Sequence, residues 1–176
     1  MNRSKVEQTV RALQYDWTLF EFDDFFKHTV AHHGRPIFLQ PVPHFDVSGY
    51  CVSVREHSTD YIFVRADDHP VSVLHNKIHE IGHFLLKHLE SVTIVDSREQ
   101  MIELMMRFSR LRSHKQLSPA LAVEEHEAEY FAYLVTQRVA KAKRLTALTL
   151  ETESYDWGVP PFYGRFARQR KEDKEQ

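Results

Sequence analysis

The sequence predicts an α+β fold in which a small antiparallel sheet packs with helices. Apolar residues recur at three- and four-residue steps near both ends of the chain, which is the period of a helix with one buried face. Between these regions, short β-branched and aromatic runs are broken by proline, glycine and a Ser-Thr-Asp turn, as in strands. The 176 residues, 42% of them hydrophobic, suffice for one buried core. We therefore expect a single domain over residues 1–165, followed by a charged tail over 166–176.

The first helical region is expected over residues 4–33. Its apolar positions follow a helical period, with a possible break near Asp23. Gly34 and Pro36 should end it, because glycine favours the left-handed end of a helix and proline cannot continue one.

A small sheet should follow over residues 36–65, with strands near 36–40, 48–55 and 60–65. The last two of these strands are close enough in sequence to form a hairpin. A second helix is predicted over 71–89, where apolar residues again recur at helical spacing.

The remaining elements are an inserted helix and loop over 91–118 and a long helix over 119–143. Ser118 is a suitable N-cap for this last helix, and Pro119 suits its first turn, where no amide hydrogen is needed.

Composition argues against several classes of partner. A net charge of −2 and a pI of about 6.6 give no reason to expect direct binding to nucleic acid or to a membrane surface. The only cysteine, Cys51, rules out an internal disulfide and is typical of a reducing compartment. No signal peptide or run of about 20 apolar residues is present. The expected location is the cytoplasm.

The helix expected over 71–89 contains the pattern H-E-x-x-H, formed by His79, Glu80 and His83. Residues four apart share one face of a helix, so the two imidazoles can hold one metal ion. Glu80 lies beside them and is placed to act as a general base toward water without being a ligand. His75, one turn earlier, cannot easily complete a tetrahedral set from the same straight helix, and we expect it to support a ligand. We expect His88 to be dispensable for metal binding.

A third ligand must come from another element, and the helix expected over 119–143 offers acidic candidates. On a helical wheel, Glu124 and Glu127 fall within its apolar arc, and Glu127 lies deeper. A carboxylate on a core-facing side is costly unless it is paired or bound to metal. Glu127 is therefore a candidate ligand, and its alternative is a buried ion pair with Arg138. Glu124, one turn earlier, could support a metal-bound histidine from outside the ligand set.

The segments "HEIGHFLLKH" and "EEHEAEYFAYLV" together resemble the ImmA/IrrE family of small zinc-metallopeptidase domains, whose pattern is roughly H-E-[LI]-G-H-x-L-L-x-H followed by E-x-E-A-[ND]-x-F-A. The resemblance covers about residues 36–136. It implies a gluzincin-like domain with a zincin-type active-site helix and a Zn²⁺ ion between two helices. It places the zinc ligands at His79, His83 and Glu127 and the catalytic carboxylate at Glu80.

The function that this resemblance implies is hydrolysis of a peptide bond in a specific regulatory protein, such as a helix-turn-helix repressor. Such a reaction needs a second donor to the developing oxyanion. The candidates from sequence are His126, Tyr130, Tyr133 and His114.

Two other classes of protein remain alternatives. One is a non-catalytic zinc-binding module of the same fold, such as a regulator or a toxin–antitoxin component. The other is a metal-free helical protein with histidines scattered through its core.

Overall fold

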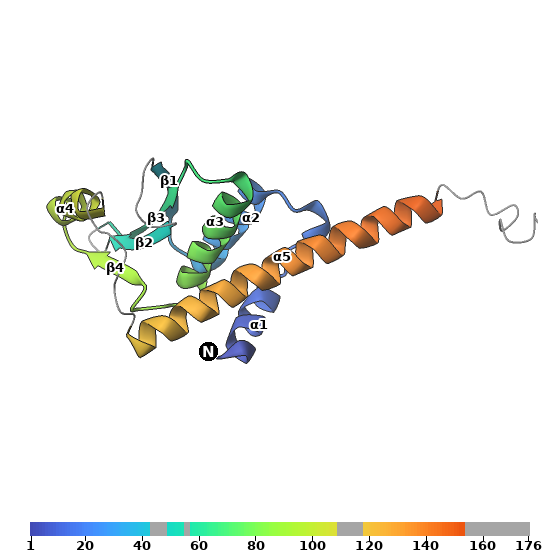
Figure 1. The fold of residues 1–176 in the computed structure, drawn as a ribbon, viewed down its shortest axis with the longest axis horizontal. Helices are drawn as coiled ribbons and strands as arrows, with labels where there is room; N and C mark the ends of the chain where they lie inside the picture. The colour runs from blue at the N-terminus through green and yellow to red at the C-terminus, as the bar shows by residue number, and fades with distance from the viewer. Residues whose placement is uncertain (43–48, 55–56, 109–117, 154–176) are drawn as a thin grey trace, which may run out of the picture. The chain divides into compact units, whose positions relative to one another are not determined.

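The structure is a computed structural model that describes residues 1–42, 49–54, 57–108 and 118–153. It confirms the α+β class, with helices packed on a four-stranded sheet (Figure 1). The elements follow in the order α1 (Arg3–Ala12), a 3₁₀ helix η1 (Trp17–Leu19), α2 (Phe22–His33), β1 (Ile37–Val42), β2 (Gly49–Val54), β3 (Thr59–Arg65), α3 (Pro70–Leu85), β4 (Val92–Val95), α4 (Arg98–Phe108) and α5 (Pro119–Glu153).

The helical region expected over 4–33 divides into α1, η1 and α2. Asp16 interrupts it by accepting hydrogen bonds from the backbone and hydroxyl of Thr18, a local arrangement that competes with helix. Gly34 ends α2 in the left-handed conformation, with φ of +78°, as predicted.

The sheet is mixed rather than antiparallel. Its strand order is β1-β3-β2-β4, in which β2 and β3 form the predicted antiparallel pair while β1 pairs with β3 and β4 pairs with β2 in parallel. Strand β4 lies in the segment expected to hold only a helix and a loop. It has four residues, too few for a period to be recognised.

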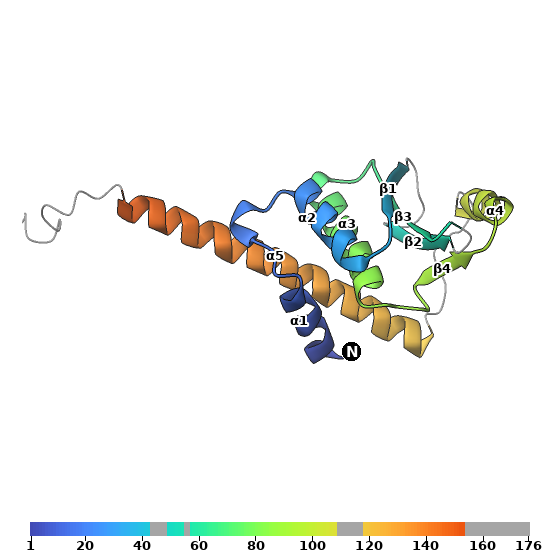
Figure 2. The ribbon, with the colours of Figure 1, turned by 180° about the vertical axis from the view of Figure 1, so that it is seen from behind.

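The two faces of the sheet belong to different apolar clusters, because side chains alternate along a strand. Cys51, Ile62 and Val64 join the main core, and α3 packs against β2 and β3. Val52 and Phe63 belong to a smaller cluster that includes residues of α4. Figures 1 and 2 show α2 and α3 together on one side of the strands, with α4 beside β4.

Helix α3 ends earlier than expected, at Leu85, in a Schellman motif. The backbone amide of His88 donates to the carbonyl of His83 at 3.0 Å, and the amide of Lys87 donates to that of Phe84 at 3.1 Å. Lys87 takes the left-handed conformation, with φ of +56°. The motif folds His88 back against the last turn of α3.

Close packing between α3 and α5 explains the glycine within the H-E-x-x-H segment. A Cβ added at Gly82 would lie 3.0 Å from a ring carbon of Phe131 on α5. An aromatic side chain therefore occupies the space that a larger residue at position 82 would need.

Helix α5 begins at Pro119 as predicted, with the Ser118 hydroxyl accepting from the amide of Leu121 at 3.1 Å. It extends to Glu153, beyond the expected end near 143.

Contacts divide the chain into a unit of Met1–Val139 and a second of Ala140–Gln176. Among the described residues, no helix is both long and apolar enough to cross a membrane. The expected tail over 166–176 lies outside the described residues.

Candidate metal centre

Three side chains from α3 and α5 bring metal-binding atoms together: His79, His83 and Glu125. The Nε2 atoms of the two histidines lie 3.0 Å apart. One oxygen of Glu125 lies 3.3 Å from Nε2 of His79, and its other oxygen lies 3.7 Å from Nε2 of His83. The helical spacing of the histidines therefore gives the common face that the sequence predicts.

A tetrahedral zinc ion sets how far apart its ligand atoms lie. Bonds of about 2.0–2.1 Å to nitrogen and oxygen at tetrahedral angles put neighbouring donor atoms about 3.4 Å apart. The two histidine nitrogens, at 3.0 Å, and the nearer Glu125 oxygen, at 3.3 Å from Nε2 of His79, lie close to that value, and one ligand atom from each of the three residues lies within 4.8 Å of the other two. Two imidazoles and one carboxylate also form a typical donor set of a catalytic zinc site, with a fourth position left for water. The residues fit a zinc ion.

A second group, formed by His75, His79 and Glu129, also places three donor atoms close together. It shares His79 but uses the other nitrogen, since Nδ1 of His79 lies 3.3 Å from Glu129. A neutral imidazole offers one lone pair only, so His79 cannot serve both groups in that form. Glu129 is exposed, whereas His83 is buried and Glu125 is partly covered. The group with Glu125 is the better site.

The structure places Glu125, and not the predicted Glu127, beside His79 and His83. Glu127 is buried, as the helical wheel indicates, but it lies outside the ligand group. Its carboxylate accepts from the backbone amide of Asn2 at 2.6 Å and lies 3.3 Å from Nε2 of His88, with Lys5 at 3.7 Å. The alternative partner, Arg138, stacks on Trp17 instead. A ligand beside an open cavity need not be the deepest residue of its helix, and the Glu125 side chain is 39% exposed where that of Glu127 is 6%.

Glu124 and His75 have roles different from direct support of a ligand. Glu124 accepts hydrogen bonds from the amides of Leu89, Glu90 and Ser91, which fastens the loop after α3 to α5. His75 lies 3.0 Å from Glu129, which in turn contacts His79. The hydrogen bond of His75 thus goes to Glu129, and its ring also lies against that of His79, with centroids 6.5 Å apart.

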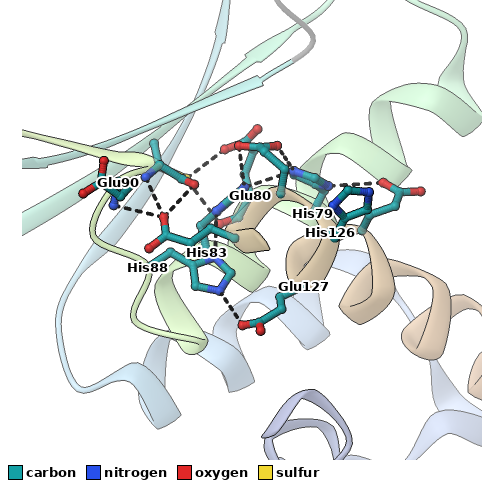
Figure 3. A network of polar contacts seen from close by, with 12 residues as sticks. His79, Glu80, His83, His88, Glu90, His126 and Glu127 are labelled. Atoms are coloured by element: carbon teal, nitrogen blue, oxygen red, sulfur yellow. Dashed lines mark hydrogen bonds and ion pairs between the residues drawn. The ribbon is translucent and has the colours of Figure 1, made fainter. Parts of the chain in front are cut away.

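Glu80 points from α3 toward strand β2 and is buried against it. The thiol of Cys51 donates to Oε2 of Glu80 at 2.8 Å. A Cβ added at Gly49 would lie 2.7 Å from Cγ of Glu80, so only glycine leaves room for this side chain. Together with the candidate ligands, these residues line a cavity of about 420 Å³. Figure 3 shows Glu80 beside His79 and His83.

The environment shifts the pKa of His83 in the direction suited to metal binding and the pKa of Glu80 in the direction suited to proton transfer, whereas the pKa of His79 moves the other way. Burial raises the pKa of Glu80 to about 7, although the charge of His79 acts in the opposite direction and lowers it. Burial and the charge of His79 lower the pKa of His83 to about 3. Burial also works to lower the pKa of His79, but Glu125, Glu80 and Glu129 raise it overall. His83 is thus neutral at pH 7, the form that binds metal.

Three of the donors proposed from sequence for an oxyanion, His126, Tyr130 and Tyr133, lie in the described part of the chain and are not among the residues that line the cavity. His126 is exposed and contacts the carbonyl of Ala122 on its own helix at 2.6 Å. Tyr130 donates to Glu7 of α1 at 3.1 Å, and Tyr133 stacks on Tyr130. His114 lies outside the described residues.

Polar residues missed by the sequence reasoning also line the cavity, among them Asn76 and Tyr50, whose hydroxyl contacts Thr93. Glu125 could have been found, since it is the first glutamate of the E-x-E-A pattern. No local sequence signal identifies Tyr50, Cys51 or Gly49, because only the tertiary structure brings strand β2 next to the candidate metal centre.

Comparisons of the chain with protein-family models, with curated proteins and with solved structures give no match. The likeness to the ImmA/IrrE pattern therefore rests on the two sequence motifs.

Proposed function

We propose that the chain is a zinc-dependent metallopeptidase related to the ImmA/IrrE family, with His79, His83 and Glu125 as zinc ligands and Glu80 as the catalytic carboxylate. The observation that carries this proposal is the meeting of three ligand atoms, all within 4.8 Å of one another, with a buried carboxylate on the wall of one cavity. A purely structural zinc site is normally closed by a fourth protein ligand, whereas these three leave one position open.

When bound, a zinc ion lowers the pKa of a water molecule toward neutrality and polarises a carbonyl group. Glu80 accepts a proton in the cavity and returns it to the leaving amine. A general base works best with a pKa near the operating pH, and burial gives Glu80 a pKa of about 7. Cys51 and Gly49 hold the carboxylate of Glu80 in place from strand β2. The hydroxyl of Tyr50 and the amide of Asn76 are the hydrogen-bond donors that we propose for the developing oxyanion.

The proposed substrate is a regulatory protein, and the resemblance points to a DNA-binding regulator of the helix-turn-helix class. The chain's own net charge of −2 gives no reason for it to bind nucleic acid directly.

Zinc content is first measured for the wild-type chain and for Glu80→Gln. Each of the two proteins is then co-expressed with every DNA-binding regulator that is encoded by a neighbouring gene. Glutamine keeps the size of the side chain but cannot take a proton from water. We expect one zinc per chain in both proteins and a shortened regulator with the wild type alone. Equal zinc with the same cellular effect from both proteins would favour a non-catalytic binding module. Absence of zinc from untagged wild type would favour the metal-free alternative.

A further inference from the structure

A buried chain of polar side chains leads from the candidate metal centre to helix α1 (Figure 3). Nδ1 of His83 lies 2.9 Å from Nδ1 of His88, and Nε2 of His88 lies 3.3 Å from Oε2 of Glu127. Glu127 then accepts from the backbone amide of Asn2 at 2.6 Å, and Lys5 adds a charge at 3.7 Å. His83, His88 and Glu127 are 2%, 4% and 5% exposed, so water does not compete for these contacts.

The chain of contacts fixes which nitrogen of each ring carries hydrogen. An ionised carboxylate can only accept, so the hydrogen shared with Glu127 belongs to Nε2 of His88. A neutral His88 then has a lone pair at Nδ1, which must accept the Nδ1 hydrogen of His83. Neutral His83 is left with its lone pair at Nε2, the atom that faces His79 and Glu125. The outer contacts therefore select the one tautomer of His83 that can bind metal at this centre.

The backbone also places His88 for this role. The Schellman motif at the end of α3 returns the chain so that His88 packs on His83, and Lys87 adopts a left-handed conformation to allow it. Such a conformation is uncommon for residues other than glycine. The ring planes of His83 and His88 meet at 72°, with centroids 5.0 Å apart.

We propose that His88 and Glu127 are positioning residues that hold His83 in its metal-binding tautomer and orientation, with α1 fixing Glu127. The proposal rests on the proposed function, since His83 is a ligand only if the centre binds metal. It revises the expectation from sequence that His88 is dispensable. Outer partners of metal-bound histidines typically change metal affinity by 10- to 100-fold when they are removed.

The chain offers a control in a second pair of a histidine and a carboxylate. The partly buried His33 lies 2.7 Å from Asp60, which is 1% exposed, and Arg35 also contacts Asp60. His33 lines a cavity with His83 and His88, but no hydrogen bond or ion pair described for it reaches His83, His88 or Glu127. Replacing His33 with alanine therefore breaks a histidine–carboxylate pair beside the same cavity and leaves the hydrogen bonds from His83 to Glu127 in place.

The experiment measures zinc affinity by competition with a chelator for the wild type, His88→Ala, Glu127→Ala, Glu127→Gln and His33→Ala. Each protein is measured at a temperature where circular dichroism shows it to be folded. We expect zinc affinity to fall 10- to 100-fold in His88→Ala and Glu127→Ala and to fall less in Glu127→Gln, which keeps one acceptor oxygen. His33→Ala should bind zinc like the wild type, although it melts at a lower temperature.

A second readout needs no metal. Long-range ¹H–¹⁵N spectra of the metal-free protein at pH 7.5 should show His83 with hydrogen on Nδ1 in the wild type and a mixture of tautomers in His88→Ala. If His88→Ala does not fold, the same spectra are recorded for Glu127→Gln and Lys5→Met. We expect a smaller change in the tautomer of His83 in each of these two proteins.

The outcomes separate this inference from the proposed function. A wild type that binds no zinc would contradict the proposed function, while the tautomer of His83 would still test the positioning role. Zinc affinity and tautomer unchanged in folded His88→Ala and Glu127→Ala would overturn the inference and leave the metal centre intact. Equal losses of affinity in His88→Ala and His33→Ala would also overturn it, because they would indicate a general effect of stability.

Discussion

Replacing Glu80 with glutamine should stabilise the metal-free protein near pH 8 and change its stability little near pH 5. Burial raises the pKa of Glu80 from 4.5 to about 7 in the folded chain. The unfolded chain therefore loses this proton near pH 4.5, but the folded chain keeps it until about pH 7. Because the folded state binds more protons between these values, the stability of the wild type falls as pH rises through this range.

The size of the effect follows from the same pKa values. A rise from 4.5 to about 7 corresponds to about 3 kcal/mol of lost stability above pH 7. Little of this is screened by solvent, since Glu80 is only 7% exposed. Glutamine cannot ionise, so Glu80→Gln should escape the loss. For a chain of this length, about 3 kcal/mol is a rise of about 6 to 12 °C in melting temperature.

The assay is thermal unfolding of both proteins in chelator from pH 5 to pH 8. The difference between the two melting temperatures should be small at pH 5, grow toward pH 7 and then stay level. Glu129→Gln is the control, because Glu129 is exposed and its replacement should give no such gain at pH 8. A difference between the wild type and Glu80→Gln that does not vary with pH would refute the burial of an ionisable Glu80.

Three further predictions concern the centre. Glu125→Ala should remove stoichiometric zinc binding, measured by metal analysis after dialysis, whereas Glu127→Ala should weaken binding without abolishing it; the reverse order would restore Glu127 as the ligand. Gly49→Ala should keep zinc but lose proteolysis, because the added methyl group displaces Glu80; full activity would show that the carboxylate is not confined there. Chelation should lower the melting temperature at pH 7.5 by several degrees, since zinc at a thousandfold excess over its Kd adds about 4 kcal/mol to folded-state stability. Acidification should have a similar effect, because both imidazoles must be neutral to bind; superimposable melts of loaded and chelated protein would contradict a metal that joins α3 and α5.

The sequence predicted elements whose signals are local. Helical periodicity was sufficient for the start of α3, although not for its end, and capping residues were sufficient for the start of α5, where Ser118 and Pro119 act as expected. The sheet was harder, because parallel pairing of β1 with β3 and of β2 with β4 joins strands through long connections that leave no local pattern.

The candidate site divides in the same way. His79, Glu80 and His83 follow from spacing along one helix, and the structure places them together. The third ligand depends on how α5 is rotated against α3. The helical wheel correctly indicated that Glu127 is buried, but burial alone did not distinguish a residue paired with His88 from one facing the cavity. Only the packing of the two helices makes that distinction.

The central claim is that one zinc ion lies between α3 and α5. Anomalous diffraction at the zinc edge, from crystals of the full chain prepared with zinc, tests it most directly. The account predicts one strong peak within about 2.1 Å of Nε2 of His79, Nε2 of His83 and a carboxylate oxygen of Glu125. A crystal without a peak there, or with its peak among His75, Nδ1 of His79 and Glu129, would contradict the account.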